Sequence, residues 1–261
     1  MRIRAAAVAV TTCAALALGA LTVPGAQAAE GPTITKVVVN GGKNIVVGPS
    51  AVKKFTASVT GSDPSGVIST GLYLWYGSGS AAEAKGQISP AGERTCTASS
   101  TTTTTCTYPF QVMANSRGYT NEVSNSLAGS WHVSAWAFSK NRVQTVDDTF
   151  TTVKVQRASR LTVNATPEPV KKGKTITITG ALSRANWNTH TYAGYAGQTI
   201  KLQYRTKSSL TYTTLRTVTT SSTGTLRAAV TATADGYYRY SFAGNSTTPA
   251  VNAPGDFVDV Q

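Results

Sequence analysis

The chain contains few of the residues on which enzymes depend. Its 261 residues include two histidines, His132 and His190, and 11 aspartates and glutamates. A serine hydrolase needs a base that a carboxylate orients beside the nucleophile, and no Gly-x-Ser-x-Gly turn accompanies either histidine. A glycosidase needs two paired carboxylates, and the acidic residues stand in no motif that suggests such a pair. The sequence therefore predicts a protein that is not an enzyme, and an enzyme with dispersed carboxylates is the less favoured alternative.

Patterns that bind metal ions are equally scarce. The three cysteines form no Cys-x-x-Cys pair, and no segment resembles the loop of an EF-hand. Asp147 and Asp148 are adjacent, whereas Asp256 and Asp259 would point to opposite faces of a regular strand. We therefore expect neither a bound metal nor a cofactor.

One long apolar run is present, and it lies at the N-terminus. Arg2 and Arg4 precede the almost uncharged residues 5–23, and small residues ending in Ala28 and Ala29 follow. This order is typical of a secretory signal peptide, here residues 1–28. The mature chain would then be secreted, extracellular or associated with the cell wall, and would contain no membrane span. A retained membrane anchor, which needs about 20 apolar residues, is the alternative.

The signal peptide contains Cys13, so the mature chain keeps Cys96 and Cys106. In an oxidising exterior, an even pair this close in sequence is expected to form a disulfide. It would close a loop, residues 97–105, that consists almost entirely of Ser and Thr. Metal ligation or redox catalysis would require a Cys-x-x-Cys pair or neighbouring histidines, which are absent.

Basic residues outnumber acidic ones. The formal charge is +13, of which the signal peptide carries +2, so the mature chain has a charge of +11. Outside a cell, this charge favours anionic surfaces such as wall polymers, acidic polysaccharides or the outer membrane leaflet. The alternative is that scattered charges keep the protein soluble, because the longest basic run is only Lys171, Lys172 and Lys174 around Gly173. No nucleic-acid-binding motif accompanies the charge, so we do not expect nucleic acid as a partner.

After the signal peptide, short runs of alternating apolar and polar residues, rich in threonine, replace helical periodicity. Such runs, separated by Gly, Pro, Asn and Ser, predict strands at 33–39, 54–61, 67–76, 94–98, 105–112, 130–138, 149–155, 161–165, 174–182, 199–205, 212–219, 225–232, 237–242 and 256–260. Each half thus has the roughly seven strands of an immunoglobulin-like sandwich. The sequence predicts an all-β fold of two tandem immunoglobulin-like β-sandwich domains, residues 30–157 and 158–261, with the disulfide in the first.

Several segments resemble a known group of proteins. They are residues 157–174 (RASRLTVNATPEPVKKGK), 182–187, 195–198, 201–204 and 234–239, which together span nearly all of 158–261. In the first half the similarity is looser and rests on residues 39–43 and 128–131. The chain resembles secreted actinobacterial proteins with tandem immunoglobulin-like domains, which often carry labels such as calcium-binding or surface protein. The resemblance implies a fold and an extracellular location, but no established activity and no catalytic residues.

Aromatic residues mark the best candidate surface. Trp187, Tyr192 and Tyr195 lie, with His190, in a segment containing Gly and Asn before residue 199, and we expect this segment to be a loop. Flat rings in a loop can stack on sugar rings or pack against a protein partner.

Together these features predict a secreted, non-enzymatic binding or structural protein. It would engage anionic or carbohydrate components of the cell envelope or matrix. A binder of another extracellular protein, such as an inhibitor or adhesin, is the alternative, and the oligomeric state is left open. The candidate ligand-binding residues are Trp187, Tyr192, Tyr195, Lys171, Lys172 and Lys174.

Overall fold

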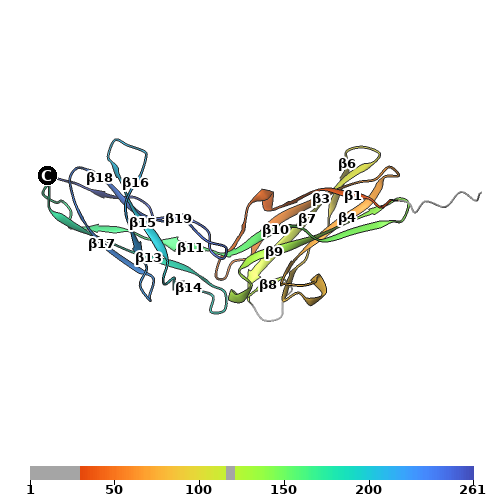
Figure 1. Cartoon of the computed structure of the whole chain (residues 1–261), viewed down its shortest axis with the longest axis horizontal. Helices are drawn as coiled ribbons and strands as arrows, with labels where there is room; N and C mark the ends of the chain where they lie inside the picture. Colours follow the sequence, from red (N-terminus) through yellow and green to blue (C-terminus); the bar gives the residue numbers. More distant parts are fainter. Residues whose placement is uncertain (1–29, 116–120) are drawn as a thin grey trace, which may run out of the picture.

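The structure is a computed structural model that describes residues 30–115 and 121–261. The expected signal peptide, residues 1–28, lies outside the described residues. No helix in the described part of the chain is long and apolar enough to cross a membrane. The described residues form two β-sandwiches that lie end to end in an elongated molecule (Figure 1).

Strands account for nearly all of the regular structure. The first half contains β1 (Thr33–Val39), β2 (Ile45–Val47), β3 (Lys53–Ser62), β4 (Val67–Tyr76), β5 (Gly86–Ile88), β6 (Thr95–Ala98), β7 (Thr103–Ala114), β8 (Glu122–Val123), β9 (Gly129–Ser139) and β10 (Gln144–Arg157), with the 3₁₀ turns η1 (Asn40–Gly42), η2 (Ala81–Glu83) and η3 (Asn125–Leu127). The second half contains β11 (Ser159–Leu161), β12 (Asn164–Thr166), β13 (Thr175–Asn186), β14 (Thr191–Gly194), β15 (Thr199–Thr206), β16 (Thr213–Thr219), β17 (Thr225–Thr231), β18 (Gly236–Phe242), β19 (Val251–Asn252) and β20 (Asp256–Val258).

The first sandwich has the strand order of an immunoglobulin domain. One sheet runs β1-β3-β7-β6, with β8 beside β7, and the other runs β2-β10-β9-β4-β5. Immunoglobulin domains place strands A, B, E and D in one sheet and C, F and G in the other. Here β1, β3, β7 and β6 correspond to A, B, E and D, and β4, β9 and β10 correspond to C, F and G.

The second sandwich repeats this arrangement. β13 is the centre of one sheet, where it pairs with β11, β12, β14 and β17, and the other sheet runs β16-β15-β18-β19, with β20 beside β18. Its A, B and E strands therefore face its C, F and G strands. The predicted all-β fold of tandem immunoglobulin-like sandwiches is confirmed.

Each sandwich encloses its own apolar core. In the first domain, Trp131 and Val133 on β9 are fully buried, and the rings of Phe55 and Phe110 stack at 5.2 Å. In the second domain, Ile178 is fully buried, and the Tyr240 hydroxyl donates to its carbonyl oxygen at 2.9 Å. Each fully buried side chain of this size stabilises the fold by about 1.5–3 kcal/mol.

The disulfide connects an exposed edge strand to the first core. Cys96 on β6 and Cys106 on β7 are cross-strand partners and form the predicted disulfide. Cys106 is fully buried, whereas β6 is exposed along its whole length. The bond thus holds β6 against a strand that is anchored in the core.

His132 is partly buried on the outer face of β9 in the first domain. Its ring stacks on Trp75 at 4.3 Å. Trp75 is itself almost fully buried, and its indole N–H donates to the backbone oxygen of Asp148 at 2.6 Å. The irregular part of β10 therefore contacts Trp75, on which the His132 ring packs.

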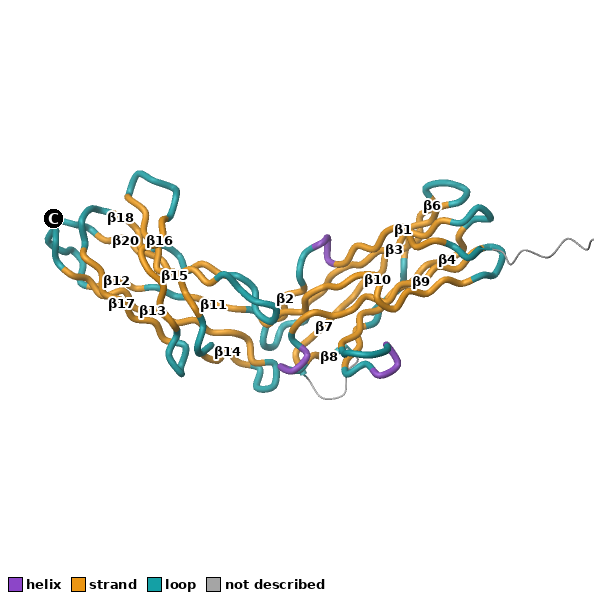
Figure 2. Tube along the Cα trace, viewed as in Figure 1, coloured by secondary structure: helices purple, strands orange, loops and turns teal. Residues whose placement is uncertain are grey.

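The segment that we expected to be an aromatic loop is a β-hairpin at the domain joint. β13 continues to Asn186, and β14 pairs back onto it. At the tip, Trp187 is fully buried among core residues of the first domain, and its Nε1 donates to the Val47 oxygen at 3.1 Å. The expectation that Trp187 lies in a ligand-binding loop is corrected, because its ring is buried in the core cluster of the first domain. The hairpin that carries it lies at the joint between the two sandwiches (Figure 2).

Polar contacts also cross the joint. Asn125 accepts a hydrogen bond from the Trp187 backbone at 2.9 Å and donates to the Asn186 side chain at 2.8 Å. His190 Nδ1 lies 3.0 Å from the Pro49 oxygen. Arg157 is 7% exposed, and burial, with the nearby charge of Arg184, lowers its pKa to about 10. These contacts hold the two domains in one relative orientation.

Candidate functional site

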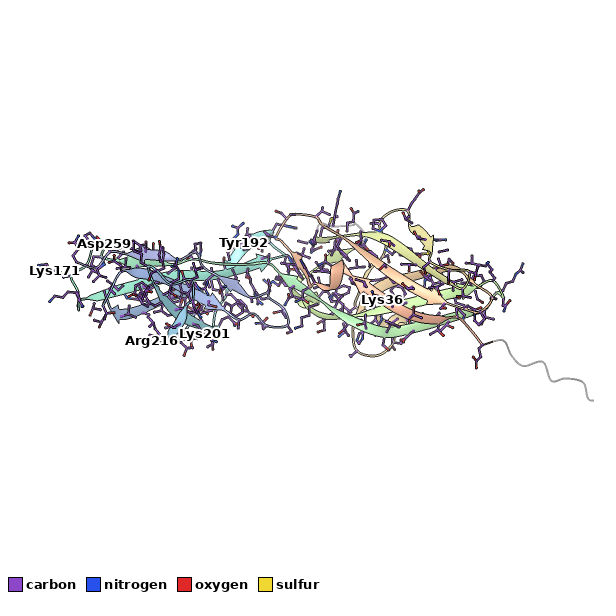
Figure 3. The ribbon with its side chains drawn as sticks, turned by 90° about the horizontal axis from the view of Figure 1, so that it is seen from above. Lys36, Lys171, Tyr192, Lys201, Arg216 and Asp259 are labelled. Atoms are coloured by element: carbon purple, nitrogen blue, oxygen red, sulfur yellow. A yellow bond between two sulfur atoms is a disulfide. The ribbon has the colours of Figure 1, made fainter. Side chains whose placement is uncertain are left out.

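The structure does not bring the sequence-based candidates together. Lys171, Lys172 and Lys174 are exposed in the turn before β13, at the end of the second domain that is far from the first (Figure 3). Tyr192 on β14 lies beside the domain joint in the same view. The lysines and the aromatic residues therefore lie at opposite ends of the second domain.

Tyr192 and Tyr195 are half-buried, and an arginine covers each ring. The Arg160 guanidinium lies 3.7 Å from the centre of the Tyr192 ring, and Arg184 lies at the same distance from Tyr195. Burial alone would raise the pKa of Tyr195, but a hydrogen bond from Asn245 and the charge of Arg184 lower it overall. One face of each ring is thus occupied by the protein's own side chains.

Basic and aromatic side chains converge on the outer surface of β15 and β18. Side chains alternate between the two faces of a strand, so the buried Leu202 and Tyr240 leave their neighbours pointing outward. The antiparallel register places Gln203 opposite Arg239 and Arg205 opposite Tyr237. We define the β15–β18 face as Lys201, Gln203, Arg205, Lys207, Tyr212, Tyr237, Arg239 and Phe257.

The cations of this face lie over its rings. The Arg239 guanidinium is 3.8 Å from the centre of the Tyr212 ring, and Arg205 is 3.8 Å from that of Tyr237 and 5.4 Å from that of Tyr212. Each such contact stabilises the arrangement by about 0.5–1 kcal/mol at an exposed site. Tyr212 therefore holds both arginines in place.

Hydrogen bonds orient the same two arginines. Arg239 Nε donates to Gln203 Oε1 at 2.9 Å, and Arg205 Nη1 donates to the Ser209 oxygen at 2.7 Å. Both acceptors are uncharged oxygens, so these hydrogen bonds do not neutralise the positive charge of either guanidinium. The one ion pair within residues 30–115 and 121–261 joins Lys207 Nζ and Asp235 Oδ2 at 3.8 Å.

The surroundings of the face keep it cationic. Residues 158–261 contain 11 basic and four acidic residues, a net charge of +7. Burial, together with the nearby Tyr204, raises the pKa of Tyr238 to about 12. Burial and, to a smaller extent, the negative charge of Asp235 raise the pKa of Tyr204. Both shifts move these phenols further from ionisation, so neither ring offsets the positive charge at physiological pH.

This geometry is suited to binding anions. A guanidinium that stacks on a ring still presents its N–H edges, which match a carboxylate or phosphate with two parallel hydrogen bonds. The arginines already cover one face of Tyr237 and of Tyr212, so a nucleobase could stack on that face only after displacing them. Among the described residues, no group of three His, Cys, Asp or Glu side chains is placed to hold a metal ion.

The sequence contained a partial signal for this face. Lys201, Gln203 and Arg205 alternate in one expected strand, and Tyr237 and Arg239 alternate in another. Alternation shows that each set shares a face. It does not show that β15 and β18 are neighbours, because their pairing joins residues far apart in the sequence.

Comparisons with known proteins add little to this picture. A family model described as a family of unknown function (DUF5707) matches residues 45–137, which is about a third of the chain and lies within the first domain. No curated protein matches the chain.

Among solved structures, the chain is similar to the fibronectin(III)-like modules of CbhA from Clostridium thermocellum, with 9% identity, a TM-score of 0.34, and coverage of 86% of this chain and 93% of that one. It is also similar to the D00-D0 domain of Intimin, with 15% identity, a TM-score of 0.28, and coverage of 85% and 99%. The adhesin InvE of Yersinia pseudotuberculosis gives 14% identity, a TM-score of 0.27, and coverage of 85% and 59%. At these scores the likenesses support no inference about a ligand, an actinobacterial source or calcium.

Proposed function

We propose that this protein is a secreted, non-enzymatic binding protein that holds a linear anionic polymer of the cell envelope or matrix on its β15–β18 face. The observation that carries the proposal is the pair Arg205 and Arg239, half-buried, stacked on Tyr237 and Tyr212, and without a carboxylate partner among the described residues. Preorganised guanidiniums bind carboxylates and phosphates with little loss of side-chain entropy.

The spacing of the cations favours a polymer over a small anion. Lys201 and Arg205 are four residues apart on β15, and Arg239 lies on β18 opposite Gln203, which stands between them. Side chains on one face of a strand repeat about every 6.6 Å. The face therefore offers three cations in a row, and a chain with repeated anionic groups can engage them together.

The rest of the sequence supports an extracellular setting for this proposal. Residues 1–28 have the pattern of a signal peptide, and the disulfide between Cys96 and Cys106 is of a kind that persists outside the cytosol. Anionic polymers that carry carboxylates or phosphates are the partners that a basic protein would meet there.

The test measures the affinity of the purified protein for polygalacturonate, for polyglycerol phosphate and for neutral dextran. We expect binding to one or both anionic polymers and none to dextran, and the two anionic arms distinguish carboxylate from phosphate recognition. The variant with Arg205→Ala and Arg239→Ala should bind about tenfold more weakly, because two charge contacts of about 0.7 kcal/mol each are lost.

A matched control removes the same charge elsewhere. The variant with Lys171→Ala and Lys172→Ala also loses two cations, and we expect its affinity to change by less than about threefold. If this control loses as much affinity as the arginine variant, the assignment to the β15–β18 face is wrong. Absence of binding to both anionic polymers at low salt, or tighter binding to single-stranded DNA than to either, would overturn the proposed function.

A further inference from the structure

The β15–β18 face does not end at the domain joint, because surface hollows continue it onto the first domain. Three hollows, of about 320, 350 and 390 Å³, follow one another along the molecule. The first includes Lys201 and Ser241, which are cross-strand partners on β15 and β18. It therefore begins where the face ends.

Shared walls make the three hollows one groove. Residues 243–245, after β18, line both the first and the second hollow. Asn44 and Lys154 of the first domain line both the second and the third. The third hollow then extends between residues 37–39 of β1 and 151–154 of β10. We call these three hollows the joint groove.

The joint groove is positively charged. It is lined by three lysines, Lys201 from the second domain and Lys154 and Lys43 from the first, and all three are exposed. None of the residues that line the three hollows is an aspartate or a glutamate. A polyanion that leaves the β15–β18 face at Lys201 thus meets cations and no carboxylate in the walls ahead of it.

Side-chain amides connect the two halves of the groove. Asn44 Nδ2 donates to Gln156 Oε1 at 3.0 Å, and Gln156 Nε2 donates to the Asn245 oxygen at 2.8 Å across the domain joint. Asn245 Nδ2 in turn donates to the Tyr195 hydroxyl at 2.8 Å. Gln156 is 2% exposed, so its two hydrogen bonds are partly shielded from water. The backbone walls of the groove from the two domains are therefore linked to each other by hydrogen bonds before any ligand binds.

We propose that one chain of the anionic polymer lies along the β15–β18 face and continues through the joint groove to Lys154 and Lys43. This inference rests on the proposed function and adds to it the direction of the polymer, its minimum length and a role for the first domain. Because the groove is already formed, the added contacts require little reorganisation of the protein.

The experiment measures the affinity of the protein for a short and a long oligomer of whichever anionic polymer binds. The short oligomer is long enough to cover only the β15–β18 face. We expect the long oligomer to bind the unchanged protein more tightly. The variant with Lys43→Ala and Lys154→Ala should bind the long oligomer about three- to tenfold more weakly than the unchanged protein does. Its affinity for the short oligomer should be the same as that of the unchanged protein. Both lysines are exposed, so the substitutions should leave the fold intact.

A second variant, with Lys85→Ala and Lys140→Ala, removes two exposed lysines of the first domain that do not line the groove. It should bind both oligomers with unchanged affinity. If length has no effect, or if the two lysine variants behave alike, the groove proposal is overturned while binding of the short oligomer still supports the proposed function. If the short oligomer does not bind at all, the proposed function itself is wrong, and the groove proposal, which rests on it, is wrong as well.

Discussion

At the scale of single residues, the account depends on how two arginines are held. Arg205 and Arg239 come from different strands, and both reach the ring of Tyr212, which precedes β16. An arginine on a surface loses side-chain entropy when it binds a ligand. Stacking removes part of this entropy in advance, so the tyrosine influences binding without itself contacting the anion.

Replacing Tyr212 tests this role. Tyr212→Ala removes the ring on which Arg239 stacks and the more distant ring contact of Arg205. It should weaken polymer binding about three- to tenfold, because the freed arginines must then lose more side-chain entropy on binding. Tyr212→Phe retains the ring and should bind nearly as well as the unchanged protein. Both affinities can be measured by titration with the same polymer. Equal loss in the two variants would show that the hydroxyl matters rather than the ring.

At the scale of secondary-structure elements, the hairpin of β13 and β14 is what makes two domains one unit. Its tip inserts Trp187 into the core cluster of the first domain and places Asn186 against Asn125. The apolar part of this contact centres on one large, fully buried side chain. The orientation of the domains, and with it the continuity of the joint groove, therefore depends on this tip.

Trp187→Ala should uncouple the two domains, so that they move and unfold independently of each other. Loss of a buried tryptophan costs about 3–5 kcal/mol in a core, and here the loss falls on contacts between domains. We expect a broader distribution of interatomic distances in small-angle X-ray scattering and separate unfolding transitions in calorimetry. Trp136→Ala, on a half-buried ring away from the joint, serves as the control. Scattering from Trp187→Ala that matches the unchanged protein would contradict the account of the joint.

The elements also show how far the sequence could predict this structure. The expected strands 33–39 and 67–76 match β1 and β4 at both ends, because their patterns and flanking turns are clear. The hairpin was missed, since residues 191–194 form a strand only by pairing with the extended end of β13. Trp187 therefore looked like a loop residue. The β15–β18 face was missed because strand pairing, which no local pattern encodes, brings Arg239 beside Gln203.

At the scale of the whole molecule, six of the basic residues form a line that runs along both domains. The β15–β18 face and the joint groove place Lys207, Arg205, Arg239, Lys201, Lys154 and Lys43 along one continuous path over both domains. The cluster of Lys171, Lys172 and Lys174 lies at the far end of the second domain and stays a separate prediction (Figure 3). A line of cations along an elongated molecule is an arrangement that can follow a linear polyanion (Figure 1).

Lysine acetylation followed by mass spectrometry tests this claim most directly, because it reports on both regions in one sample. With saturating long anionic polymer, we predict slower acetylation of Lys201, Lys207, Lys154 and Lys43, and unchanged acetylation of Lys171, Lys172 and Lys174. Protection of the last three lysines with no protection along the path, or unchanged acetylation throughout while the polymer is bound, would contradict the account.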